Sequence, residues 1–264
     1  MLSRLRRLIG RNPISDRLWR AALTRTPYAK VLPAAKRLQL RALATRFLRS
    51  KSFEPAHDFV MPELACVLVA LRASLPVLEL GLDYYDAWTA IVMYPGDFRV
   101  RHNYTDEIGV EHHYVDELCG ESLSQGPIVL SWDTVDRQRG TDSSDLVVHE
   151  CAHKLDILNG DANGFPPLHS SMNRRAWTEA FSRGYEALVD DLDRGEKVSL
   201  DPYAATDAAE FFAVASETFF TKPRRLARSY PQVYEQLRLF YRQNPLSLAR
   251  TKRRSRPSGR RGQN

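Results

Sequence analysis

The stretch DSSDLVVHECAHKLDILNG, residues 142–160, constrains this chain more than any other. It contains His149-Glu150-Cys151-Ala152-His153, an H-E-x-x-H motif. On an α-helix, residues four apart lie about one turn apart on the same face, so both imidazoles can reach one metal ion. Glu150 then lies next to the first ligand, where it acts on a water molecule rather than on the metal. The motif predicts a metal site on a helix.

The residues around the motif are those of a helix. Residues 142–144 (DSS) offer N-cap oxygens ahead of an apolar run. Asn159-Gly160 is typical of a helix end. Cys151 faces away from the two histidines, so we expect it in the core rather than at the metal. The alternative is a fortuitous pair of helical histidines, which the lack of a third ligand would favour.

The length indicates one large domain or one domain with appendages, and the cysteine content favours the cytoplasm. The chain has 264 residues, and its three cysteines lack C-x-x-C spacing, which favours a reducing compartment. It has no run of 18 apolar residues, so we expect no membrane-spanning helix. The N-terminus lacks the apolar segment of a secretory signal.

Positive charge is concentrated at the two ends. Residues 1–50 hold 13 Lys and Arg and one acid, and residues 250–264 hold seven and none. Such ends can contact nucleic acid or an anionic membrane. Without a recognised nucleic-acid motif we favour solvated segments. We therefore predict a basic, loosely ordered arm with short helical pieces over residues 1–35, a catalytic domain over 36–246 and a basic disordered tail over 247–264.

The apolar pattern favours an α+β fold that is mostly helical, with a small mixed sheet before the metal helix. The remaining helices are predicted at residues 34–50, 63–75, 173–193, 204–221 and 230–243. Strands are predicted at residues 87–94 and 127–133, and the edge of the second could pair with an extended substrate. The polar segment between them, 96–126, is predicted to be a loop, with His102, His112 and His113 on the surface.

A catalytic zinc usually takes three protein ligands, so a third one is needed. The best stretch for it is DPYAATDAAEFFAVASETFF, residues 201–220, where Tyr203, Glu210 and Glu217 are each seven residues apart. Seven residues are about two helical turns, which places all three on one face. Alanines and phenylalanines flank Glu210, and a partly buried carboxylate favours a cation nearby. Spacing alone leaves Glu210, Glu217 or neither as the third ligand.

The stretch HECAHKLDILNGDANGFPPL, together with DPYAATDAAEFFAVASETFF, resembles the bacterial Mlc titration factor A family. LPVLELGLDYYDAW (75–88) and QGPIVLSW (125–132) resemble further blocks of that family, so the likeness covers about residues 40–245. The resemblance implies a zinc metallopeptidase with one Zn²⁺ per chain and a fold similar to lethal-factor-like zincins. It also implies an aminopeptidase acting on short peptides.

The same resemblance assigns roles to particular residues. It implies that His149, His153 and Glu210 are the zinc ligands and that Glu150 is the general base. Tyr203 matches a tyrosine that faces the reacting carbonyl group in lethal-factor-like sites.

Two further expectations concern the surroundings of this site. Asp156 falls two turns from His149 on the same face, where it could accept a hydrogen bond from a ligand histidine. The family is also linked to a glucose-responsive transcriptional repressor, Mlc, so a regulatory binding protein with a secondary zinc site is the alternative function.

Overall fold

The computed structural model describes residues 13–96, 98–105, 111–118, 120–122, 126–138 and 144–248. Of residues 98–105, 111–118 and 120–122 it describes the backbone. The side chains of His102, His112 and His113 therefore lie outside what is described. So do Cys119, the first part of the predicted arm (1–12) and nearly all of the predicted tail (249–264).

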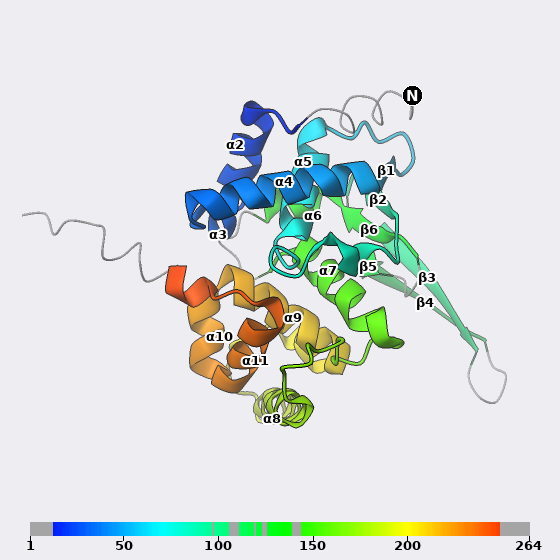
Figure 1. The fold of residues 1–264 in the computed structure, drawn as a ribbon. Helices are drawn as coiled ribbons and strands as arrows, with labels where there is room; N and C mark the ends of the chain where they lie inside the picture. Colours follow the sequence, from blue (N-terminus) through cyan, green and yellow to red (C-terminus); the bar gives the residue numbers. More distant parts are fainter. Residues whose placement is uncertain are drawn as a thin grey trace, which may run out of the picture.

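Helices dominate the described chain, and the predicted helices are present (Figure 1). The N-terminal ones are α2 (Asp16–Arg25), α3 (Pro27–Lys30), α4 (Ala34–Ser50) and α5 (Glu63–Ser74). The central ones are η1 (Leu82–Tyr85), α6 (Trp132–Arg137), α7 (Leu146–Asp156) and η2 (Ile157–Asn159). The C-terminal ones are α8 (Arg174–Asp193), η3 (Pro202–Ala205), α9 (Ala208–Thr221), α10 (Pro223–Ser229) and α11 (Pro231–Tyr241). Figure 1 shows α7 between the N-terminal helices and the C-terminal group α8–α11.

A small mixed sheet precedes α7 in the chain, as predicted. Its strand order is β1 (Ser52–Pro55), β2 (Ala90–Tyr94), β6 (Ile128–Ser131) and β5 (Gly120–Ser122). The β1–β2 and β2–β6 pairs are parallel, and the β5–β6 pair is antiparallel. Because β6 pairs on both sides, the predicted use of its edge for a substrate is wrong. The terminal strand on that side of the sheet is β5, and α7 packs against both β5 and β6.

The prediction of a loop over residues 96–126 is also wrong. This segment contains β3 (Phe98–Thr105) and β4 (Glu111–Leu118), which form an antiparallel hairpin that extends away from the body (Figure 1). It also contains β5. The hairpin strands pair with each other and belong to a separate two-stranded sheet. The sequence signal for it is weak, because Phe98, Val100 and Tyr104 alternate with polar residues in β3 but β4 shows no such alternation.

Residues 16–30 contain short helices of the kind expected within the arm over 1–35. They form α2 and α3, with Trp19 and Leu23 buried in the core. Ser15 caps α2 by accepting a hydrogen bond from Leu18 N at 3.4 Å. Pro27 starts α3 instead of breaking it, because a first-turn residue needs no N–H donor. The domain boundaries at residues 35 and 246 stay a prediction.

The loop at residues 160–167 is fixed to three helices through Gly164. Gly164 N donates to Asp156 Oδ2 of α7 at 2.7 Å, and Trp177 Nε1 of α8 donates to Gly164 O at 3.1 Å. Gly164 has φ of +73°, and a Cβ atom there would lie 2.4 Å from the carbonyl oxygen of Ala208 in α9. This position therefore requires glycine for its backbone angle and for its close approach to α9.

We expect Gly164→Ala to lower the free energy of unfolding by about 2–4 kcal/mol, because backbone strain and a collision with backbone add together. Gly195→Ala is the matched control, since Gly195 has φ of +70° but nothing within 4 Å of the added methyl group. We expect that control to lower the free energy of unfolding by about 1–2 kcal/mol, from backbone strain alone. Chemical denaturation of both variants measures the difference, and equal losses would contradict the close approach.

Candidate metal centre

Helix α7 carries the H-E-x-x-H motif, and its boundaries follow from its caps. Asp145 is the N-cap, and its Oδ1 atom accepts a hydrogen bond from Val148 N at 3.2 Å. The cap predicted within residues 142–144 thus lies one residue too early. Gly160, with φ of 129°, follows the last turn at the predicted end. Cys151 is fully buried in the hydrophobic core, as predicted.

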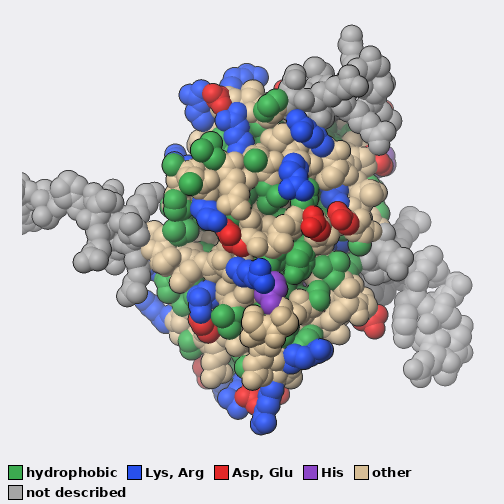
Figure 2. Space-filling model, viewed as in Figure 1, with side chains coloured by type: hydrophobic (Ala, Val, Ile, Leu, Met, Phe, Trp, Pro, Cys, Tyr) green, Lys and Arg blue, Asp and Glu red, His purple; other side chains and the backbone are tan. Residues whose placement is uncertain are grey.

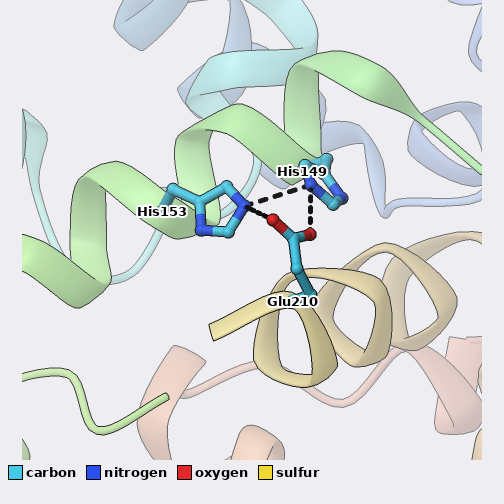
Figure 3. Close-up of side chains that lie close together, drawn as sticks. All are labelled: His149, His153 and Glu210. Carbon is cyan, nitrogen blue, oxygen red and sulfur yellow. Dashed lines mark hydrogen bonds and ion pairs between the residues drawn. The ribbon is translucent and has the colours of Figure 1, made fainter. Parts of the chain in front are cut away.

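Two imidazoles from α7 and one carboxylate from α9 converge on a point between the helices (Figure 3). The Nε2 atoms of His149 and His153 are 3.1 Å apart. Glu210 Oε2 lies 3.1 Å from His149 Nε2, and Glu210 Oε1 lies 3.3 Å from His153 Nε2. All three side chains are largely buried, at 12%, 12% and 15% exposed. The structure therefore brings the three predicted ligand residues together.

Helix α9 presents Glu210 to α7 because the chain restarts its helix just before this residue. The predicted single helix over 204–221 is divided into η3 and α9, with Asp207 as the N-cap of α9. Asp207 Oδ1 accepts a hydrogen bond from Glu210 N at 2.9 Å. The following residues, Phe211 and Phe212, are buried. The cap and this burial fix the first turn of α9 against the metal helix.

The chemistry of this group fits a divalent metal. Glu210 Oε2 is buried and close to His149 Nε2, yet it has no hydrogen-bond partner. Both atoms can donate a lone pair to one cation placed between them. Two imidazole nitrogens and a carboxylate oxygen are also the donors that catalytic zinc takes in proteins.

Charge around the site also favours an added cation. The carboxylates that surround the imidazoles outnumber the buried cations beside them in the described part of the chain. The carboxylates are those of Asp145, Glu150, Glu210 and Glu217, and the cations are Arg72 and Lys154. Burial alone disfavours a charged imidazole, but the adjacent carboxylates of Glu210 and Glu217 raise the pKa of His149 well above its ordinary value. Burial likewise opposes ionisation of Glu210, yet the imidazoles of His149 and His153 lower its pKa to about 2.

Glu150 lies beside the three converging residues without being one of them. It is 3% exposed, and its Oε2 atom has no hydrogen-bond partner. Burial raises the pKa of Glu150 to about 7, although the nearby His149 and His153 oppose that shift. A carboxyl group with a free oxygen and a pKa near neutrality is suited to accepting and returning a proton.

Tyr203 reaches the site from η3, the short helix before α9. Its ring centroid is 6.3 Å from that of His149, and the side chain is half exposed. Burial of its hydroxyl, followed by the charges of Glu210 and Glu150, raises the pKa of Tyr203 to about 12. The hydroxyl group therefore keeps its proton and can donate a hydrogen bond to a molecule bound in the site.

Glu217 is not placed as a third ligand, and Asp156 is not placed as the hydrogen-bond acceptor of His149. Glu217 is not part of the converging group: its Oε1 atom lies 2.7 Å from Nδ1 of His149, the opposite side of the ring. Asp156 was expected to accept from a ligand histidine, but for His149 that prediction is wrong, since Glu217 does so. Asp156 Oδ2 instead accepts from Gly164 N and fixes the loop at 160–167.

Arg72 is a site residue that the sequence reasoning missed. It is fully buried in α5 and pairs with Asp145, with 3.2 Å between Arg72 Nε and Asp145 Oδ2. Its guanidinium also donates to the carbonyl oxygens of Val135 at 2.8 Å and Arg25 at 3.2 Å. The available signal was a single arginine within the apolar run ELACVLVALRAS, because a charge in a buried helix requires a partner.

The family of this chain follows from comparison with known proteins. The sequence profile of the glucose-regulated metallo-peptidase M90 family matches residues 2–242. Because this match covers most of the chain, the chain belongs to the M90 metallopeptidase family. A metallopeptidase family implies a metal ion, and the group His149, His153 and Glu210 could hold one.

Several relatives carry the name Mlc titration factor A. The one from Escherichia fergusonii is 39% identical over 232 residues, which cover 86% of this chain and 86% of the relative. The one from Cronobacter sakazakii is 38% identical with the same two coverages. The one from Pectobacterium atrosepticum is 38% identical and covers 87% of each chain. Among the described residues, no helix has the length and apolar character needed to cross a membrane.

Proposed function

We propose that this chain is a zinc-dependent metallopeptidase of the zincin-like type, with one Zn²⁺ held by His149, His153 and Glu210. The observation that carries this proposal is the convergence of two imidazole nitrogens and a carboxylate beside Glu150, a buried carboxyl group with an unpaired oxygen. Membership of the M90 family supports the same class of reaction.

The residues of the chain supply proton transfer and hydrogen bonding. When bound, zinc would provide a Lewis acid that polarises a carbonyl group and acidifies water. Glu150 takes a proton from the attacking water as the oxygen bonds to the carbonyl carbon. It returns that proton to the leaving amine as the C–N bond breaks. The Tyr203 hydroxyl donates a hydrogen bond to the carbonyl oxygen as negative charge develops there.

An extended peptide would bind along β5 rather than β6. In the described chain β5 is the terminal strand of the mixed sheet on the side that packs against α7. A terminal strand has one row of backbone N–H and C=O groups that the sheet does not use, and a peptide can add to that row.

Within this class we propose an aminopeptidase acting on short peptides in the cytoplasm. The resemblance noted in the sequence supports the aminopeptidase activity. The described cysteines, Cys66 and Cys151, are both buried and free, which is consistent with a reducing compartment.

A pair of chromogenic substrates tests this activity. The zinc-loaded protein is expected to hydrolyse leucine p-nitroanilide and to leave N-acetyl-leucine p-nitroanilide intact, because an aminopeptidase requires a free amine. Release of p-nitroaniline is measured for both. Cleavage of N-blocked peptides alone would contradict the aminopeptidase but keep the metallopeptidase. Failure to cleave any peptide, blocked or free, would contradict the proposed function.

The relatives' shared name favours a second function. We propose that the chain also binds a glucose-responsive transcriptional repressor of the Mlc type, either beside its peptidase activity or as a regulatory protein whose zinc site is secondary. Nucleic acid is not proposed as a partner. On the face in Figure 2, the Lys and Arg side chains of the described residues are scattered among acidic and apolar ones instead of forming a continuous basic surface.

A further inference from the structure

Glu217 connects the ring of His149 to the start of the helix that carries it. Glu217 Oε1 lies 2.7 Å from His149 Nδ1, and Glu217 Oε2 accepts a hydrogen bond from the backbone N of Asp145 at 2.5 Å. Asp145 is the N-cap of α7. The Glu217 side chain is 6% exposed, so little water competes for either oxygen. One carboxylate on α9 thus holds both the imidazole and the first turn of α7.

This contact selects the form of His149 that can bind a metal. A carboxylate only accepts hydrogen bonds, so the Nδ1 atom of His149 must carry the proton. In the neutral ring, the lone pair then lies on Nε2, the nitrogen that faces His153 Nε2 and Glu210. In the other tautomer the proton would be on Nε2, where it would block the metal.

Asp145 in turn is held by a buried network that leaves Glu217 little freedom. Its Oδ2 atom pairs with Arg72 Nε at 3.2 Å and accepts a hydrogen bond from the Tyr28 hydroxyl of α3. Asp145 is 1% exposed and Arg72 is fully buried. The N–H group that fixes Glu217 Oε2 therefore belongs to a residue whose own position is fixed by α3 and α5.

We propose that Glu217 is a positioning residue that holds His149 in the tautomer and orientation needed for metal binding, and is not itself a ligand. This inference rests on the proposed zinc site. Removing a hydrogen bond of this kind to a ligand histidine typically lowers metal affinity by about 10–100-fold. Only a carboxylate can serve here, because it accepts on both oxygens from two donors, His149 Nδ1–H and Asp145 N–H.

Glu217→Gln tests the inference with little change of shape. An amide offers one accepting oxygen, so either the imidazole or Asp145 N–H loses its acceptor. We expect zinc affinity, measured by competition with a chromogenic chelator, to fall about 10–100-fold. Tyr241→Phe is the matched control, because it removes a buried hydrogen bond to Ser216, the residue before Glu217 in α9, and leaves the network around Asp145 intact. That variant is expected to keep the zinc affinity of the wild type.

Thermal unfolding of the metal-free proteins separates positioning from stability. Each variant loses a buried hydrogen bond, so both are expected to have a lower melting temperature. If Glu217→Gln does not fold, Glu217→Asp replaces it, since the shorter carboxylate cannot reach both donors and is expected to show the same loss of zinc.

The outcomes distinguish this inference from the proposed function. Unchanged zinc affinity in Glu217→Gln, or an equal loss in Tyr241→Phe, would overturn the positioning role and leave the zinc site standing. Absence of zinc binding by the wild type would overturn the zinc site and the positioning role with it.

Discussion

Glu150→Gln is expected to keep its zinc and to lose about 10²–10⁴-fold in kcat on the free-amine substrate. Glutamine has nearly the same shape, but its amide cannot take a proton from water. Metal binding should persist because Glu150 is not among the converging residues. Its Oε2 atom also has no hydrogen-bond partner, so the substitution costs little packing or bonding. Steady-state kinetics and the zinc content of the same preparation measure both parts.

Two comparison variants sharpen that result. Tyr203→Phe removes one hydrogen-bond donor and is expected to lower kcat by about 10²–10³-fold. Glu186→Gln changes an exposed glutamate of α8 and should leave the rate unchanged. Full activity in Glu150→Gln would contradict its role as general base.

Glu150→Gln also separates the two proposed functions. A repressor-binding protein with a secondary zinc site should keep its partner when Glu150 is replaced. A protein that acts by hydrolysis should lose its effect on the cell. Binding of an Mlc-type repressor, measured with the purified variant, distinguishes these outcomes.

Glu210→Gln is expected to weaken zinc binding by more than about 100-fold, because losing a ligand costs more than losing a hydrogen bond to one. The metal-free variant should be no less stable than the wild type, since the change removes one charge from a site where carboxylates exceed cations. The cap that Asp207 gives to α9 uses the backbone of residue 210 and remains. Zinc titration and thermal unfolding measure the two effects.

The exposed variant Glu186→Gln again serves as the control for Glu210→Gln and should bind zinc normally. Retained affinity in Glu210→Gln would move the third ligand to another residue. Glu217 would then be the first to reconsider, because it lies against the same histidine.

The metal helix could be predicted because its evidence is local. The spacing of His149 and His153, the polar residues before them and the glycine after them all lie within one short stretch. The third residue of the candidate metal site was harder to predict. Glu210 and Glu217 both face His149, but on opposite sides of its ring, and a spacing of seven residues does not show which nitrogen each one meets. The resemblance favoured Glu210, and the structure places Glu210 in the converging group.

The support around the site could not be predicted because its partners are distant in sequence. Tyr28, Arg72 and Asp145 come from three helices, and their network forms only when those helices pack. The β3–β4 hairpin was missed for a different reason. Only β3 carries the alternation of a strand, through Phe98, Val100 and Tyr104, and β4 carries none.

The central claim is that zinc held by His149, His153 and Glu210 is required for peptide hydrolysis. Stepwise addition of zinc to the metal-free wild-type protein tests it most directly, with bound zinc and hydrolysis of leucine p-nitroanilide followed together. The account predicts that hydrolysis rises in proportion to bound zinc and stops rising at one zinc per chain. Hydrolysis by the metal-free protein, or zinc binding at one per chain without any hydrolysis, would contradict it.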